Sequence, residues 1–154
     1  MEEIIQIREE LSCDIQTVFN FFTINKYLES WLTEKADIEP RVGGKYELFW
    51  DPNNKVDNST LGCKITGIET NKFISFNWKD PVQFRSFMNF ANPLTHVIVF
   101  FSKIDKEPDK TTIHLFHTGW RDDPSWEEAR NYFENAWLNA LQGLKERIMR
   151  KELP

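Results

Sequence analysis

The sequence SWEEARNYFENAWLNALQGLKERI, residues 125–148, has the pattern of one long amphipathic helix. Its large apolar side chains recur at helical spacing, at Trp126, Phe133, Trp137, Leu141, Leu144 and Ile148. Ser125 and Glu128 have the spacing of a capping box, in which a hydroxyl and a carboxylate each bind a free backbone N–H. We therefore predict an amphipathic helix of about 25 residues beginning at Ser125.

Six strand-like segments precede this helix. They are rich in β-branched and aromatic residues and read ADIEP, KYELFW, TLGCKITGI, KFISFNW, HVIVFFSKI and TTIHLFHTGW. The Gly43-Gly44 pair favours a tight hairpin, whereas DPNNKVDN and DKEPDK favour longer turns. Six strands joined by turns of this kind predict an antiparallel meander.

The first 35 residues change from strand to helical spacing. Ile5, Ile7 and Leu11 favour an opening strand, and two short helices follow, with Asp14 and Asn25 as their expected N-caps. The order is β-α-α-β6-α, in which only the long helix is large enough to cover one face of the sheet. We expect a single α+β domain over residues 1–154, with a curved antiparallel sheet wrapped around the C-terminal helix.

Composition limits the classes of partner. The 154 residues include 13 Phe and 6 Trp, which favours a thick core or an aromatic-walled cavity. The net charge is −5 with no basic run, so nucleic acid and anionic membranes are not expected partners. The sequence has no apolar run long enough for a membrane span and no apolar signal region. We expect a soluble cytoplasmic protein in which Cys13 and Cys63 are free thiols.

Several motifs together resemble a known family. In chain order they are YLESWL, RVGGKYEL, GCKITGIETNKFISFNWK, THVIVFF, HLFHTGW and YFENAWLNALQGLKERI. This set resembles the domain of activators of the heat-shock-protein-90 ATPase and their homologues, within the SRPBCC (START-related, birch-pollen-allergen-like) superfamily. The resemblance covers nearly the whole chain and implies a helix-grip fold with an apolar cavity between sheet and helix.

The resemblance implies a binding protein for a small hydrophobic ligand. Strand parity and helix face then give the expected cavity walls: Tyr46, Leu48, Trp50, Ile65, Phe76, Trp78, Val99, Phe101, Leu115, Phe133 and Trp137. A chaperone regulator is an alternative implied by the family. The eukaryotic activators carry a further N-terminal domain that this chain has no residues to form.

Two histidines lie three residues apart in the last predicted strand. Since side chains alternate along a strand, His114 should face solvent and His117 the interior, so the pair cannot hold one metal ion. His117 is either a hydrogen-bonded structural residue or, by analogy with polyketide cyclases of this fold, an acid/base in a pocket shaped by Trp78 and Phe101. No nucleophile is identifiably paired with His117. We therefore expect no catalytic residue, and keep His117 as the alternative.

An insertion and one arginine complete the candidate site. Residues 80–94 are too apolar for a plain hairpin loop and hold Phe84, Phe87, Met88 and Phe90. They form either a lid over the cavity or a plug that completes the core. Arg130 lies near the aromatic face of the helix, where it could bind an anionic group of a ligand or pair with Glu127 or Glu134.

Other motifs fail as sites. Glu47 should point to water, because Tyr46 and Leu48 occupy the opposite face of its strand. In DPNNKVDNS, Lys55 and Val56 stand where a calcium-binding loop requires a ligand oxygen and a glycine. The glycine pair before Lys45 lacks the spacing of a phosphate-binding loop. We therefore expect no metal and no cofactor.

Overall fold

The computed structural model describes residues 3–154, so residues 1 and 2 of the predicted domain lie outside the described part. The elements are β1 (Ile5–Leu11), α1 (Ile15–Thr23), α2 (Asn25–Trp31), β2 (Lys35–Ile38), β3 (Tyr46–Phe49), β4 (Ile65–Glu69), β5 (Phe73–Trp78), η1 (Val82–Phe84), α3 (Arg85–Met88), β6 (Thr95–Ile104), β7 (Glu107–Thr118) and α4 (Pro124–Met149). The predicted β-α-α-β6-α order is confirmed, with η1 and α3 inserted between β5 and β6.

The strands form two sheets. One has five antiparallel strands in the order β1-β7-β6-β5-β4, and the other pairs β2 with β3. The prediction of one continuous meander is wrong between β3 and β4, which belong to different sheets. The chain beside β3 is irregular. There the Thr60 hydroxyl accepts from the Leu48 N–H at 2.9 Å and donates to the Tyr46 carbonyl at 2.9 Å, so a side chain takes the place of a strand partner.

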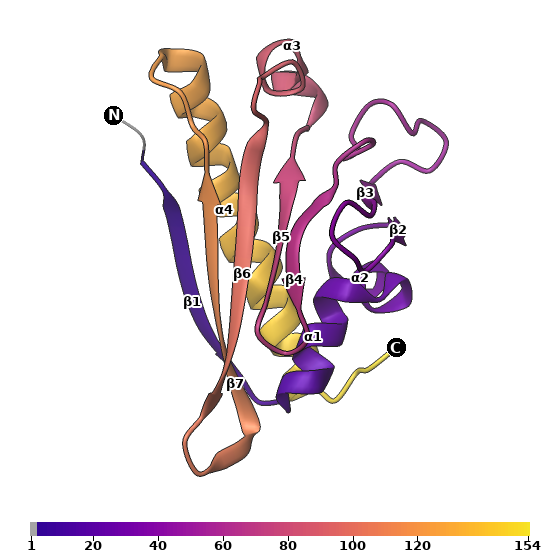
Figure 1. Cartoon of the computed structure of the whole chain (residues 1–154), viewed down its shortest axis with the longest axis vertical. Coiled ribbons are helices and arrows are strands. Elements are labelled where there is room, and N and C mark those ends of the chain that lie inside the picture. Colours follow the sequence, from indigo (N-terminus) through magenta and orange to yellow (C-terminus); the bar gives the residue numbers. More distant parts are fainter. Residues whose placement is uncertain (1–2) are drawn as a thin grey trace.

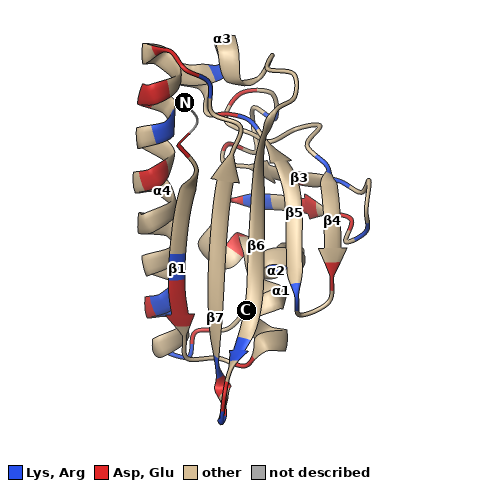
Figure 2. Cartoon of the chain, turned by 60° about the vertical axis from the view of Figure 1, so that its left-hand side comes forward, with Lys and Arg blue, Asp and Glu red and all other residues tan. Residues whose placement is uncertain are grey.

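Helix α4 lies across one face of the five-stranded sheet, with α1 and α2 beside its C-terminal half (Figure 1). Its buried face carries the residues expected from the sequence, Trp126, Phe133, Trp137, Leu141, Leu144 and Ile148. Charged residues recur along α4, none of them among its buried residues, whereas most of the length of the five-stranded sheet has none (Figure 2). This arrangement is the expected α+β helix-grip fold.

The helix caps differ in part from the prediction. Asp14 caps α1 as expected, accepting from the Thr17 N–H at 3.1 Å. The capping box at Ser125 is wrong, because α4 begins at Pro124 and its cap is Asp123, which accepts from the Ser125 N–H at 2.8 Å. Asn25 does not cap α2; its side chain accepts from the Ile38 N–H at 2.9 Å and so ties α2 to β2.

The helices of residues 3–154 were compared with the length and hydropathy that a membrane-spanning helix requires. None of the helices described there is both long enough and apolar enough to cross a bilayer. The longest, α4, spans 26 residues and contains charged residues along much of its length (Figure 2).

Candidate functional site

The centre of the molecule is filled by its own side chains. The rings of Tyr46 and Phe76 stack with centroids 3.8 Å apart, and Phe101 packs against Phe22 at 5.4 Å. Seven of the predicted cavity walls lie in this core, each at most 5% exposed: Tyr46, Leu48, Ile65, Phe76, Val99, Phe101 and Leu115. The structure therefore places these residues in packed core, and not around a ligand-sized space.

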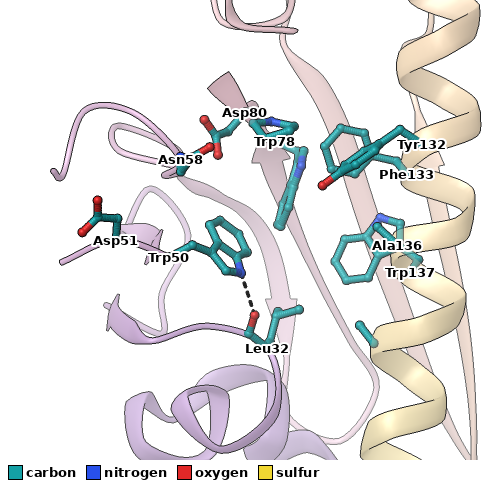
Figure 3. Close-up of a pocket in the computed structure, with 12 residues that line it drawn as sticks. Leu32, Trp50, Asp51, Asn58, Trp78, Asp80, Tyr132, Phe133, Ala136 and Trp137 are labelled. Carbon is teal, nitrogen blue, oxygen red and sulfur yellow. Dashed lines mark hydrogen bonds between the residues drawn. The ribbon is translucent and has the colours of Figure 1, made fainter. Parts of the chain in front are cut away.

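A pocket of about 370 Å³ opens instead between the middle of α4, the end of β5 and the chain that follows β3 (Figure 3). It is lined by Leu32, Trp50, Asp51, Asn58, Trp78, Asp80, Pro81, Tyr132, Phe133, Ala136, Trp137 and Ala140. Four of these were expected from the sequence: Trp50, Trp78, Phe133 and Trp137. The volume lies at the lower end of the range for small-molecule sites.

Trp78, at the end of β5, forms the inner wall of the pocket. Its indole packs on Trp137 at 5.1 Å, on Phe133 at 6.1 Å and on Trp50 at 5.9 Å between ring centroids. Trp50 is fixed in turn by its indole N–H, which donates to the Leu32 carbonyl at 2.8 Å (Figure 3). The pocket is therefore walled by aromatic rings that other contacts already hold in place.

The helix side of the pocket has a signal that sequence reasoning missed. Ala136 and Ala140 are one helical turn apart and both line the pocket. Small side chains at this spacing leave room beside Trp137 that larger residues would fill. Tyr132 extends the same face, and Figure 3 shows its hydroxyl pointing toward the Trp78 indole.

Two buried polar atoms belong to the pocket lining. The indole nitrogen of Trp78 and Oδ1 of Asp80 have no hydrogen-bond partner among residues 3–154. Trp78 is 4% exposed and Asp80 is 2% exposed, so solvent scarcely reaches either residue. Buried polar groups are normally paired, because an unpaired one costs about 1–3 kcal/mol.

The carboxyl of Asp80 is shifted toward its neutral form. Burial raises its pKa to about 7, although the backbone N–H groups of Ser59 and Asn58 and the charge of Lys79 act in the opposite direction. Its own backbone N–H donates to Oδ1 of Asn89 at 2.8 Å, which fixes the backbone of Asp80. No sequence pattern singles out Asp80, because its surroundings include the backbone of Asn58 and Ser59, which are distant from it in sequence.

His117 faces the interior, as expected, but lies behind the pocket and does not line it. Its Nδ1 accepts the indole N–H of Trp137 at 3.1 Å, and its Nε2 lies 3.0 Å from the Thr95 hydroxyl. An indole nitrogen can only donate, so the proton of the neutral ring is on Nε2 and is donated to Thr95. Thr95 in turn donates to the Trp78 carbonyl at 3.0 Å.

These hydrogen bonds occupy both ring nitrogens of His117. Burial, and secondarily the charge of His96, lowers the pKa of its imidazole to about 3. An acid/base at neutral pH needs a pKa near 7 and contact with the reacting group. His117 has neither, so its geometry does not support the acid/base alternative.

The insertion between β5 and β6 packs against α4. Phe84 contacts Tyr132 at 5.4 Å and Phe87 contacts Trp126 at 5.0 Å between ring centroids. Met88 is fully buried, whereas Phe90 is 80% exposed. Of this segment only Asp80 and Pro81 line the pocket, so the expected lid residues lie beside the pocket and not across it.

The segment is also joined to the loop on the other side of the pocket. The Val82 N–H donates to Oδ1 of Asn58 at 3.1 Å, and Arg85 forms an ion pair with Asp57. These contacts link the two segments that form the rim of the pocket.

The remaining candidates lie elsewhere. Arg130 pairs with Glu134 at 2.9 Å, one of the two ion pairs considered from the sequence, and borders a separate, smaller pocket. Glu47 accepts from the Gly62 N–H at 2.8 Å, and His114 stacks on Phe116 at 4.2 Å. Within residues 3–154 no cluster of His, Cys, Asp and Glu could hold a metal ion.

Comparison with known proteins gives one match in sequence. A family model described as "Activator of Hsp90 ATPase homolog 1-like protein" matches residues 12–148. Among proteins with curated descriptions, no significant match was found.

Solved structures share the fold. Protein MLL2253 from Mesorhizobium loti has a TM-score of 0.74 at 18% identity, covering 98% of this chain and 100% of that chain. The Aha1 dimer from Colwellia psychrerythraea has a TM-score of 0.70 at 16% identity, covering 95% and 96%. An HSP90 activator from Plasmodium falciparum has a TM-score of 0.64 at 19% identity, covering 98% and 97%. At these identities the likeness shows the fold alone.

Proposed function

The chain belongs to the family of activator of Hsp90 ATPase homolog 1-like proteins, and we propose that it binds a small hydrophobic molecule in the pocket between β5 and α4. The proposal differs from the sequence-based one in position. The ligand lies between the middle of α4 and the end of β5, against Trp50, Trp78 and Trp137, and not along the whole sheet–helix interface.

The observation that carries this proposal is the aromatic lining of a preformed pocket. Trp50, Trp78, Tyr132, Phe133 and Trp137 all border it, and Trp50 is 37% exposed. Apolar surface that a ligand would remove from water contributes about 25 cal/mol per Å² to binding. The rings are held by their own contacts, so little ordering is required when a ligand binds.

The test is an NMR titration of the protein with 2-methylnaphthalene. We expect saturable shifts of the indole N–H resonances of Trp50 and Trp78. In the variant Ala136→Phe a ring fills the pocket, and these shifts should be lost. The matched control is Leu138→Phe, which adds a ring at a position of α4 that is 45% exposed and does not line the pocket. Binding that survives in Ala136→Phe and is lost in Leu138→Phe would contradict the proposal.

A second candidate function is contact with the chaperone. It rests on the family description and on the structural likeness to an HSP90 activator. We propose to test it by measuring the ATPase rate of heat-shock protein 90 with increasing amounts of this protein. An unchanged rate at saturating concentration would exclude activation. A cytoplasmic location and a single domain over residues 1–154 are part of the same proposal, in keeping with two cysteines that are free in the structure.

A further inference from the structure

The five-stranded sheet has an outer face, on the side away from α4. Figure 1 shows α4 behind the sheet and none of the helices of residues 3–154 in front of it. Antiparallel sheets commonly carry polar residues on a face that is left in water. This face carries a cluster of aromatic rings instead. We propose that it forms a symmetric homodimer, by packing against the same face of a second copy of the chain. Such a dimer would form with or without a ligand in the pocket.

The aromatic cluster consists of Phe73, Phe100, His114 and Phe116. Phe100 is 44% exposed, and its ring centroid lies 6.1 Å from that of Phe73 and 5.9 Å from that of Phe116. His114 stacks on Phe116 at 4.2 Å. Phe73 lies across β4, since a Cβ at Gly67 would come within 2.9 Å of its ring. Apolar side chains gathered on an exposed surface in this way are typical of a protein contact site.

Strand register places five residues in one row across the whole outer face. Glu69 pairs with Phe73, Phe73 with Phe100, Phe100 with His114, and His114 with Arg8. Residues directly opposite each other on antiparallel strands share one face of the sheet. The row therefore begins with an acid on β4, ends with a base on β1, and has Phe100 of the middle strand, β6, at its centre.

The two ends of this row carry opposite charges. Arg8 and Glu69 are both exposed, and within residues 3–154 neither forms an ion pair. The adjacent row on the outer face is uncharged and consists of Gly67, Ser75, Ile98, Phe116 and Gln6. The outer face therefore presents one charge at each edge, with aromatic and other uncharged residues between them.

The order of residues in the charged row selects the symmetry of the dimer. A two-fold axis parallel to β6 and passing by Phe100 lays the row on its own reversed copy. Phe100 then meets Phe100 of the second copy, and the Glu69 and Arg8 of each chain face the Arg8 and Glu69 of the other. An axis along the row would instead bring like charges together, which is unfavourable. The first arrangement uses the same patch on both chains, as a two-fold interface requires.

The row on the other side of the charged row obeys the same symmetry. It contains Glu10, which pairs with Thr112, and Ser102, which also pairs with Thr112. Its far end is the turn at Lys72, whose carbonyl accepts from the Phe101 N–H at 2.8 Å. The axis parallel to β6 brings Glu10 toward the turn that carries Lys72 of the second copy. This row therefore adds no contact between like charges.

The polar groups at the opposite end of the outer face are already paired. The Thr66 hydroxyl lies 2.8 Å from the Ser75 hydroxyl and 2.6 Å from Nε2 of His96. Burying a polar group is unfavourable chiefly when the group has no hydrogen-bond partner. This part of the face can therefore lie against a second copy without leaving these groups unpaired.

The size of the cluster sets the expected strength of the dimer. Each of its rings is less than half exposed, so the apolar area available is small beside the roughly 800 Å² per partner of a stable complex. We therefore expect a reversible dimer with a dissociation constant in the micromolar range.

Sedimentation velocity from about 1 μM to about 500 μM protein, near pH 7, measures this dissociation constant. Arg8→Glu and Glu69→Arg each turn both charged contacts into contacts between like charges, and each should weaken the dimer about tenfold or more. The matched controls are Lys26→Glu on α2 and Glu128→Arg on α4, which make the same charge changes at exposed positions away from the outer face. They should leave the dissociation constant unchanged.

Mixing the two charge variants tests the symmetry itself. In a heterodimer of Arg8→Glu with Glu69→Arg, every charged contact of the row again joins opposite signs. An equimolar mixture should therefore dimerise about as tightly as the natural protein, although neither variant does so alone. A variant that was merely misfolded would not recover in this way.

The centre of the interface is tested by Phe100→Lys, which places two like charges at the two-fold axis. We expect no dimer, with thermal unfolding confirming that the variant is folded. The control Phe90→Lys changes a phenylalanine that is 80% exposed and lies outside the sheet, and should dimerise normally. A protein that stays monomeric throughout the concentration range would overturn the proposal. So would a dimer that neither charge reversal weakens, or a mixture of the two variants that fails to recover.

Discussion

Trp137 donates its indole N–H to Nδ1 of His117 across 3.1 Å, and both side chains are at most 3% exposed. This contact joins α4 to β7 through a polar bond inside an otherwise apolar core. It also uses the one lone pair through which a neutral imidazole could act as a base. The histidine that looks most reactive in the sequence is therefore held as part of the core.

Removing this indole N–H should destabilise the fold. Trp137→Phe leaves a ring in place but deprives the buried Nδ1 of its donor, which costs about 1–3 kcal/mol of unfolding free energy. Urea unfolding near pH 7 measures the loss. The control is Trp50→Phe, whose acceptor, the Leu32 carbonyl, lies in an exposed contact that water can replace. A loss for Trp137→Phe no larger than that of the control would contradict the structural role of His117.

The buried carboxyl of Asp80 should make stability depend on pH. Its pKa is raised from 3.8 to about 7, so the folded state holds the proton more tightly than the unfolded state does. The free energy of unfolding therefore falls as pH rises from about 4 to about 7 and is constant above that range. Asp80→Asn removes this dependence on pH. The free energy of unfolding of the variant, relative to that of the natural protein, should therefore rise by about 2–4 kcal/mol between about pH 4 and about pH 7.

The titration of His117 changes the free energy of unfolding with pH in the opposite direction. Its effect must be separated from that of Asp80. Its pKa is lowered from 6.5 to about 3, so the unfolded state takes up the proton first and stability is lost as pH falls below about 6.5. Both the natural protein and Asp80→Asn keep His117, so the difference between their unfolding curves isolates Asp80. A difference that stays constant from about pH 4 to about pH 8 would show that Asp80 titrates normally.

The two thiols should differ in reactivity. Cys63 is fully buried, and burial raises its pKa to about 12. Cys13 is half-buried, and its pKa is raised to a smaller extent by burial and by the charge of Asp14. Iodoacetamide should label Cys13 before Cys63 in the folded protein, and both residues equally in denaturant. Mass spectrometry of the digested protein measures this order, and Cys13→Ser should abolish the early label.

Two glycines should respond oppositely to alanine. A Cβ at Gly44 would overlap the Glu39 carbonyl oxygen, so Gly44→Ala should cost about 2–3 kcal/mol through a forced backbone shift. A Cβ at Gly143, inside α4, meets nothing within 4 Å. Gly143→Ala should therefore stabilise the protein by about 0.5–1 kcal/mol. Thermal unfolding of both variants tests the prediction, which fails if the two shifts have the same sign.

Most of the fold follows from sequence periodicity. The spacing of Trp126, Phe133 and Trp137 predicts α4 and its buried face, and strand alternation predicts that His117 points inward; both are observed. The order of elements is also predictable, because each is long enough to carry its own pattern. The Asp123 cap was missed, because the prediction began the helix at Ser125 and did not use Pro124 as a residue that can start a helix.

The position of the pocket could not be predicted in the same way. Strand parity identifies which side chains face inward, but it does not say whether opposing rings meet. Tyr46 and Phe76 stack directly and fill the space between them, whereas Ala136 and Ala140 leave space beside the middle of α4. Asp80 enters the lining through a loop that is closed by contacts distant in sequence, such as that between Val82 and Asn58. Contacts of this kind between distant residues leave no periodic pattern in the sequence.

The packed core and the small pocket beside α4 are largely built from different residues, so the residues that keep the chain folded are mostly not those that would contact a ligand. Among the lining residues only Trp78, Phe133 and Trp137 also belong to the buried cluster. Asp51, Tyr132, Ala136 and Ala140 lie outside this cluster, so exchanging them should cost less stability than exchanging those three, and ligand preference can change while the scaffold persists. A directed-evolution library at Asp51, Tyr132, Ala136 and Ala140 would therefore sample new specificities from a parent that tolerates the mutational load.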